Sequence, residues 1–267
     1  MDKIINSFQG QMERPGLFSL FHIISLVIII IATIIICYLF KNVNERKYKR
    51  IMLIGWIICI VLEVMKQIIK SFHYGNPSYW QYDFYDFPFH ICSSIFYIAP
   101  IIIFTSRKKH PLLYDAAIGY FCFFLLLGGT TVTLYTDMVY SNLIFTNVQT
   151  MIHHGLIVVL GIYSVVWNHK ELSFKMFLKS LIVLAILMSM AIIINVVLHP
   201  FANGIDMFFI NPLEETTLPV VNVIQRDFGY PVYLAGYILV MSSLGFITYV
   251  IEKAIINCIA KRDHDNM

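Results

Sequence analysis

The sequence predicts an all-α fold, a polytopic bundle of seven transmembrane helices that forms a single integral membrane domain over residues 1–267. Of the 267 residues, 58% are hydrophobic and only 13% are charged, whereas a soluble domain carries roughly 25% charged residues. The mean hydropathy is +0.74. Seven apolar segments interrupt the chain, and the basic residues between them fall on alternate connections. We therefore expect an integral, multi-pass protein of the cell membrane whose apolar surface faces lipid.

Each apolar segment is expected to be one helix, because a helix that crosses the hydrocarbon core needs about 20 mostly apolar residues. The third segment is short. Pro88 suits the first position of its helix, and Pro100 would kink it. The connection from about Pro200 to Tyr230 is too long for a bare turn, so it is either an ordered binding loop or a disordered external loop. In chain order the expected spans are Leu17–Phe40, Ile51–Phe72, Pro88–Thr105, Tyr114–Tyr135, Gln149–Trp167, Met176–His199 and Pro231–Ile255.

The basic residues between the spans predict an orientation. The first, third and fifth connections and the C-terminal tail hold nearly all of them, whereas the fourth connection has none and the sixth has only Arg226. Cytoplasmic connections carry the excess of Lys and Arg, so we expect the N-terminus outside and the C-terminus in the cytoplasm. The basic residues form short loop clusters with no surrounding polar domain, which argues against nucleic acid as a partner and leaves the lipid bilayer.

Ionisable side chains within the spans gather at their external ends. Such groups are costly in lipid and usually face the bundle interior or a water-filled cavity. Glu63, Lys66, Gln67 and Lys70 follow the i, i+3, i+4, i+7 spacing that places side chains on one face of a helix. A concentration of polar groups in one leaflet predicts that the functional site lies there. The residues of this outer cluster are His22, Glu63, Lys66, His90, Cys92, His153, His154 and Asn195.

Several members of the outer cluster also have a purely structural interpretation. Glu63 and Lys66 are either an ion pair that orders the packing or part of a site. Asn195 is most simply a residue that hydrogen-bonds between helices. His22 lies deep enough in its span to need a partner of either kind.

Cys92 differs from the other four cysteines because it lies at the external side, with no second cysteine there to form a disulfide. In the second turn of a helix that begins at Pro88, its sulfur would feel the positive end of the helix dipole, which favours the thiolate. A histidine from another helix would complete a thiol–imidazole pair of the kind that nucleophilic catalysis uses. His90 is two positions away and cannot face Cys92 on a regular helix. His154 or His153 is therefore the better base.

The residues around Cys92 resemble a known family. The stretch F-P-F-H-I-C at 87–92, followed by Y-I-A-P at 97–100, resembles the L-P-L-H-x-C…A-P block of the YwaF-type integral membrane proteins. The stretch H-H-G-L-I at 153–157 resembles that family's second block, a histidine–glycine pair that opens a helix. Leu62-Glu63 with Lys66-Gln67, and Asn195, resemble its second and sixth spans. The likeness covers roughly residues 15 to 255, and the relatives of the family include a eukaryotic transmembrane phospholipid acyltransferase.

The resemblance implies a phospholipid acyltransferase embedded in the membrane, with Cys92 as nucleophile and His154 as its base. Membrane phospholipid and lysolipid would be the substrates, and the thiol would attack an ester carbonyl near the outer leaflet. Glu63 would orient a histidine, and His90 or Asn195 would donate a hydrogen bond to the oxyanion. Transfer to water instead of a lysolipid would make the protein an acyl hydrolase.

The chain departs from the family at Ser93-Ser94, where many members have an acidic residue after the cysteine. Within the outer cluster, His22, Lys66 and His153 are expected to bind substrate or to support the catalytic residues. The alternative function is a non-enzymatic seven-helix receptor or carrier that binds a ligand at this polar face. No cofactor is expected, and no metal site either, because the H-x-C spacing does not place His90 and Cys92 on one helical face.

Overall fold

The computed structural model describes residues 2–137, 139–202, 204–216, 218 and 221–265, with side chains up to residue 259, so the side chains of the basic C-terminal tail lie outside it. The fold is mostly helical, and the expectation of an all-α protein is correct apart from one two-stranded hairpin. The α-helices are α1 Asp2–Ser7, α2 Leu20–Phe40, α3 Glu45–Ser71, α4 Ile95–Phe104, α5 Pro111–Tyr120, α6 Leu126–Leu134, α7 Ile144–Trp167, α8 Phe174–Leu198, α9 Val221–Phe228 and α10 Tyr230–Asp265. The remaining elements are the strands β1 Phe72–His73 and β2 Tyr79–Trp80, the 3-10 turns η1 Phe84–Asp86, η2 Cys92–Ser94, η4 His199–Phe201 and η5 Met207–Phe209, and the π-helical turn η3 Phe121–Leu125.

Six helices of the described chain are long and apolar enough to cross a membrane. They are Leu20–Phe40, Glu45–Ser71, Pro111–Leu134, Ile144–Trp167, Phe174–Phe201 and Tyr230–Ile259. Each corresponds to one of the expected spans, with ends shifted by a few residues. The third expected span is different, because its helix runs only from Cys92 to Phe104. A helix of that length rises about 20 Å, less than the roughly 30 Å of the hydrocarbon core.

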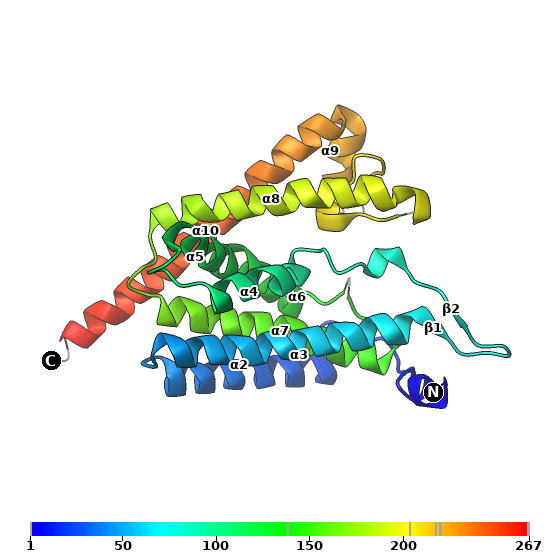
Figure 1. Cartoon of the computed structure of the whole chain (residues 1–267), viewed down its shortest axis with the longest axis horizontal. Coiled ribbons are helices and arrows are strands. Elements are labelled where there is room, and N and C mark those ends of the chain that lie inside the picture. The colour runs from blue at the N-terminus through cyan, green and yellow to red at the C-terminus, as the bar shows by residue number, and fades with distance from the viewer. Residues whose placement is uncertain (1, 138, 203, 217, 219–220, 266–267) are drawn as a thin grey trace.

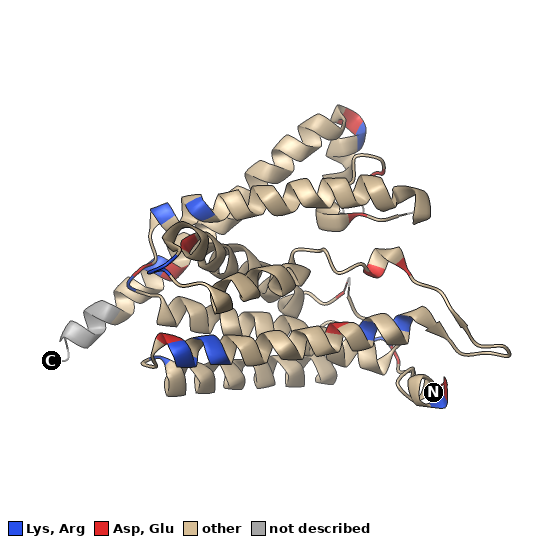
Figure 2. Ribbon diagram, in the orientation of Figure 1, with Lys and Arg blue, Asp and Glu red and all other residues tan. Residues whose placement is uncertain are grey.

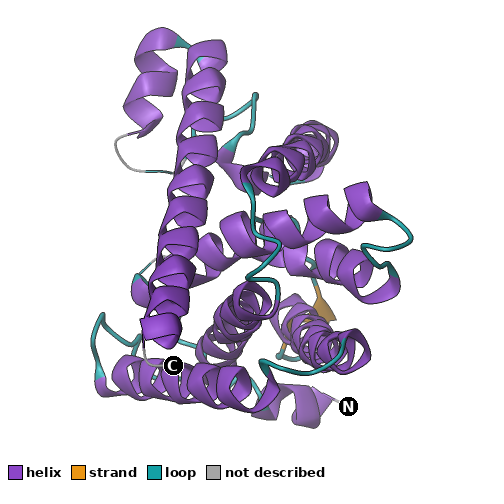
Figure 3. Cartoon of the chain, turned by 90° about the vertical axis from the view of Figure 1, so that its left-hand side faces the viewer, coloured by secondary structure: helices purple, strands orange, loops and turns teal. Residues whose placement is uncertain are grey.

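The long helices lie roughly side by side along the long axis of the molecule (Figure 1), and α7 packs against α2, α3 and α6. The second large packing interface joins α5 to α8, while α10 crosses the bundle obliquely and stands at its side in the view turned by 90° (Figure 3). Most Lys and Arg residues gather at the end of the bundle where α3 and α8 begin (Figure 2). We call this the basic end. The opposite end holds the β1–β2 hairpin and α9, and it is the end where the outer cluster lies.

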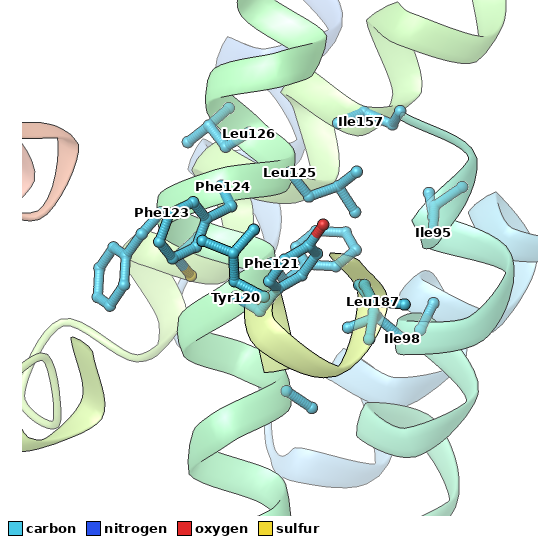
Figure 4. Close-up of a cluster of buried hydrophobic side chains, with 14 of the residues drawn as sticks. Ile95, Ile98, Tyr120, Phe121, Phe123, Phe124, Leu125, Leu126, Ile157 and Leu187 are labelled. Carbon is cyan, nitrogen blue, oxygen red and sulfur yellow. The ribbon is translucent and has the colours of Figure 1, made fainter. Parts of the chain in front are cut away.

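The core is centred on the π-helical turn η3, which joins α5 to α6 (Figure 4). All five residues of this turn are fully buried, and Ile95 of α4, Ile157 of α7 and Leu187 of α8 surround it. Cys122 lies within the turn, so it packs as an apolar residue, as its aliphatic surroundings predict. The turn anchors α6 at the centre of the bundle, from where α6 reaches the segment that carries Cys92.

Candidate functional site

Cys92 opens a 3-10 turn that leads into α4, and the expected helix from Pro88 does not form. The chain instead turns sharply at Phe87–Phe89, where the Phe89 amide donates to the Phe87 carbonyl at 2.7 Å. The turn buries the Phe89 ring between Tyr97 and Phe208, at centroid distances of 5.4 and 6.0 Å. We infer that burial of this ring stabilises the fold more than the extra turn of helix that Pro88 would allow. Cys92 therefore lies in the first turn of its helix and not in the second.

Side chains from two neighbouring helices hold this turn in place. The Ser94 hydroxyl donates to the Ile91 carbonyl at 2.6 Å and lies 3.2 Å from the Tyr120 hydroxyl of α5. The Trp56 indole of α3 donates to the Phe96 carbonyl at 3.2 Å. These bonds fix the start of α4 relative to α3 and α5, so the Cys92 side chain has a defined position.

The Cys92 side chain points toward α6, and the residue as a whole is half-buried. A Cβ atom added at Gly128 would lie 3.5 Å from the Cys92 sulfur and 3.1 Å from a methyl group of Ile91. Glycine at this position thus lets α6 approach the cysteine turn closely. Within the part of the chain that the structure describes, the thiol forms no disulfide and no hydrogen bond. It is a free thiol held among helices.

His153 of α7 is the imidazole that contacts the Cys92 residue. Its Nε2 atom lies 3.4 Å from the Cys92 carbonyl oxygen, and because a carbonyl can only accept, Nε2 carries the proton in this contact. The other nitrogen, Nδ1, is buried and has no hydrogen-bond partner among the described residues. The residue is 4% exposed, and in its neutral form with the proton on Nε2, Nδ1 is the basic nitrogen.

His154 is engaged within its own helix. Its Nδ1 lies 2.8 Å from the Thr150 carbonyl, one turn earlier in α7, and its ring makes an edge contact with His153. The following glycine has a packing role, because a Cβ at Gly155 would come within 2.7 Å of Ile29 on α2. The structure thus brings His153, and not His154, into contact with Cys92, although both residues lie in the outer cluster.

Glu63 and Lys66 form the predicted ion pair on α3, with 2.9 Å between Nζ and Oε1. The Gln67 amide donates to the Glu63 carboxylate at 2.6 Å and to the Asp86 carbonyl at 2.8 Å. Lys70 and Asp86 form a second pair at 2.5 Å. The four residues with i, i+3, i+4, i+7 spacing therefore lie on one face of α3, as expected. Through Gln67 and Lys70, this face binds Asp86 in the segment before Cys92. Asp86 is the member that the sequence did not reveal, because it lies in a connection with no regular pattern.

His90 lies between the hairpin and the cysteine turn. Its ring packs near Tyr85 and Phe209, at centroid distances of 6.1 and 5.9 Å.

His22 is a structural clamp. Its Nδ1 accepts from the Phe18 amide at 3.0 Å, and its Nε2 lies 2.8 Å from the Thr133 carbonyl. Both ring nitrogens are therefore occupied, and the side chain is fully buried. His22 ties the start of α2 to the end of α6. Among the described residues, no hydrogen bond joins His22 to Cys92.

Asn195 is a second clamp, and it holds the long connection between α8 and α9. Its side chain accepts from the Met207 amide at 2.7 Å and donates to the Met207 carbonyl at 3.0 Å. The adjacent Phe208 and Phe209 adopt left-handed φ angles of 59° and 61°, a conformation that is unfavourable for large side chains. The two bonds hold this turn against the bundle, and it places Phe208 on Phe89 and Phe209 on His90. The part of the long connection that Asn195 binds is therefore an ordered loop.

The described residues contain no group of three or more His, Cys, Asp or Glu side chains that could hold a metal ion. The arrangement is that of a polytopic membrane protein with a thiol, an imidazole and an ion pair near one end of its bundle. The model of the TMEM164 family matches residues 17–249, and the chain belongs to that family. Neither the curated proteins nor the solved structures gave a match.

Proposed function

We propose that the protein is a membrane-embedded phospholipid acyltransferase that uses the Cys92 thiol as nucleophile and His153 as base. The observation that carries this proposal is the contact between His153 and Cys92: Nε2 lies 3.4 Å from the Cys92 carbonyl oxygen, and the buried Nδ1 atom has no partner among the described residues. An unpaired nitrogen in a buried place is costly. Its retention beside a nucleophile is what proton transfer requires.

We further propose that the chain crosses the bilayer seven times, with the N-terminus outside and the C-terminus in the cytoplasm. Support comes from the charge distribution in Figure 2 and from α4, which ends near the basic end although it is shorter than a full span. The irregular segment before Cys92 would complete this crossing, since it is bound to α3 through Asp86 and buries Phe89 against Phe208 of the 205–211 connection. The outer cluster then lies within the external leaflet, at the depth of lipid ester groups.

The reaction has two balanced halves. In the first, Nδ1 of His153 takes the thiol proton while the sulfur attacks the ester carbonyl, and the departing lysolipid oxygen recovers that proton. A thioester on Cys92 remains. In the second, a lysolipid hydroxyl gives its proton to His153 and attacks the thioester, and the imidazolium returns the proton to the sulfur. A new ester and the free thiol result.

The other members of the outer cluster suit supporting roles. Lys66 provides a cation for the lipid phosphate, with Glu63 holding it in place. His90, two residues before Cys92, suits hydrogen bonding to the carbonyl oxygen on which negative charge develops. Transfer to a lysolipid, rather than to water, is supported only by the resemblance of the Cys92 and His153–Gly155 blocks to a family whose relatives include an acyltransferase.

Replacement of the nucleophile tests the proposal. The purified protein, in mixed micelles with a phosphatidylcholine and an isotopically labelled lysophosphatidylcholine, is expected to form labelled diacyl lipid. Cys92→Ala should lower this rate by about 1,000-fold or more, with an unchanged thermal unfolding midpoint. Cys37→Ala, which removes a partly buried cysteine of another helix, is the matched control. Equal rates in the wild type and Cys92→Ala would refute the proposal, and release of free fatty acid in place of a new ester would identify a hydrolase.

A further inference from the structure

A groove lies between α5 and α8, away from the outer cluster. Its volume is about 360 Å³, which is within the range of ligand pockets, roughly 300 to 1,000 Å³. Ala116 is 5% exposed and forms part of its floor, while Leu112 and Ile186 are 59% and 54% exposed and form its walls. In chain order the lining is His110, Pro111, Leu112, Leu113, Ala116, Ile182, Val183 and Ile186. The groove is therefore apolar along its length, with one titratable residue at its end.

Two lysines precede that residue. Lys108 and Lys109 are exposed, and neither has an ion-pair partner among the described residues. The Lys109 and His110 amides both bond to Ser106, at 3.3 Å to its hydroxyl and 2.8 Å to its carbonyl, so the three basic residues are held in one tight turn. His110 also provides no side-chain cap for α5, so the amides of the first turn add to the positive potential.

The carboxylates of this region are already neutralised. Asp115 pairs with Arg107 at 2.6 Å and with Lys179 at 2.7 Å. Glu171 lies 3.7 Å from Arg107. The positive charge of Lys108 and Lys109 thus remains uncompensated at the end of an apolar groove that faces lipid. A second cavity at the basic end, lined by Asn44, Glu45, Arg46, Lys49 and Ser106, differs because it is polar and includes a carboxylate.

We propose that the groove between α5 and α8 is a binding site for an anionic phospholipid of the basic-end leaflet. One acyl chain lies along the aliphatic walls, and Lys108, Lys109 and His110 hold the phosphate. Apolar length and unpaired positive charge fit the two parts of such a lipid, whereas a zwitterionic lipid would place its own cation among the lysines. The site is separate from the proposed catalytic cluster and does not depend on acyl transfer.

Native mass spectrometry of the detergent-solubilised protein tests this site, with phosphatidylglycerol and phosphatidylcholine of the same acyl chains as probes. The wild type should retain phosphatidylglycerol about tenfold more strongly than phosphatidylcholine. Lys108→Ala combined with Lys109→Ala should bring the two lipids close to parity. Lys47→Ala combined with Arg50→Ala removes two exposed cations of the same end, with no ion pair among the described residues, and should leave the preference intact.

A second variant tests the groove itself. Ile182→Trp fills it from an exposed position, so the fold should survive, and it should reduce retention of phosphatidylglycerol severalfold. Equal retention of the two lipids by the wild type would overturn the proposal, and so would an equal loss of preference in the control pair. Displacement of the lipid by millimolar inorganic phosphate would also contradict it, because it would show a phosphate site without a chain site.

Discussion

The polar residues of the outer cluster divide into two regions with opposite properties. At His22 and Asn195 every polar atom of the side chain has a partner, and each residue is fully buried. At Cys92 and His153 the thiol has no hydrogen bond within the described chain, and one ring nitrogen is left without a partner. Satisfied groups stabilise a fold, whereas a buried unsatisfied group lowers stability and needs another reason to be present. Hydrogen-bond satisfaction therefore separates the clamps from the candidate chemistry, although all four residues belong to the outer cluster.

The histidine pair gives the largest expected difference between the regions. His153→Gln keeps a donor for the Cys92 carbonyl but removes the basic nitrogen, so acyl transfer should fall by about 100- to 10,000-fold. His154→Asn keeps a donor for the Thr150 carbonyl and should change the rate less than about tenfold. Rates per folded molecule, measured in the micelle assay, check both values. A larger loss of rate in His154→Asn than in His153→Gln would instead identify His154 as the base.

Loss of the Asn195 clamp should affect stability more than chemistry. Asn195→Ala leaves the buried Met207 amide without its partner and removes one of the two donors to the Met207 carbonyl, which keeps only the longer bond from the Ile210 amide at 3.4 Å. The free energy of unfolding should fall by about 2–4 kcal/mol. Denaturation of the detergent-solubilised protein measures this change, and Asn42→Ala, at an exposed position in the α2–α3 connection, should stay within about 0.5 kcal/mol of the wild type. A stable Asn195→Ala variant without activity would instead place Asn195 in the site.

The His22 clamp should show a smaller effect of the same kind. His22→Phe removes the acceptor of the Phe18 amide and the donor to the Thr133 carbonyl, at a cost of about 1–3 kcal/mol. His22→Gln, which can still donate to Thr133, should recover part of this loss. Thermal unfolding of the two variants gives the comparison. If His22→Phe lost acyl transfer while its stability stayed unchanged, hydrogen-bond satisfaction would not distinguish the structural residues from the catalytic ones.

The sequence predicted the helices well and the connections poorly. Six spans follow from hydropathy alone, because an apolar run of sufficient length has few alternatives in a membrane. The bend at Phe87–Phe89 and the turn at Phe208–Phe209 did not follow, since both form to bury aromatic rings against segments distant in the chain. The ion pair of Glu63 with Lys66 was visible in its spacing, whereas its connection to Asp86 depends on how the hairpin folds back.

The choice between His153 and His154 shows the same limit at the candidate site. Adjacent residues on a helix point about 100° apart, so only one of them can meet Cys92. The histidine–glycine block favoured His154, yet the direction of each ring depends on how α7 packs on α2, α3 and α6. Gly155 sets part of that packing through Ile29. Local sequence identified the pair, and tertiary packing determines which of the two rings lies at hydrogen-bonding distance from the Cys92 carbonyl.

The most direct test is mass spectrometry of the Cys92 peptide after brief incubation of the protein with a phospholipid and no acceptor. We predict an added acyl mass on Cys92 that neutral hydroxylamine removes, that persists in His154→Asn and that is strongly reduced in His153→Gln. Acyl transfer that proceeds at the wild-type rate while Cys92 remains unmodified would contradict the nucleophile and, with it, the assignment of His153.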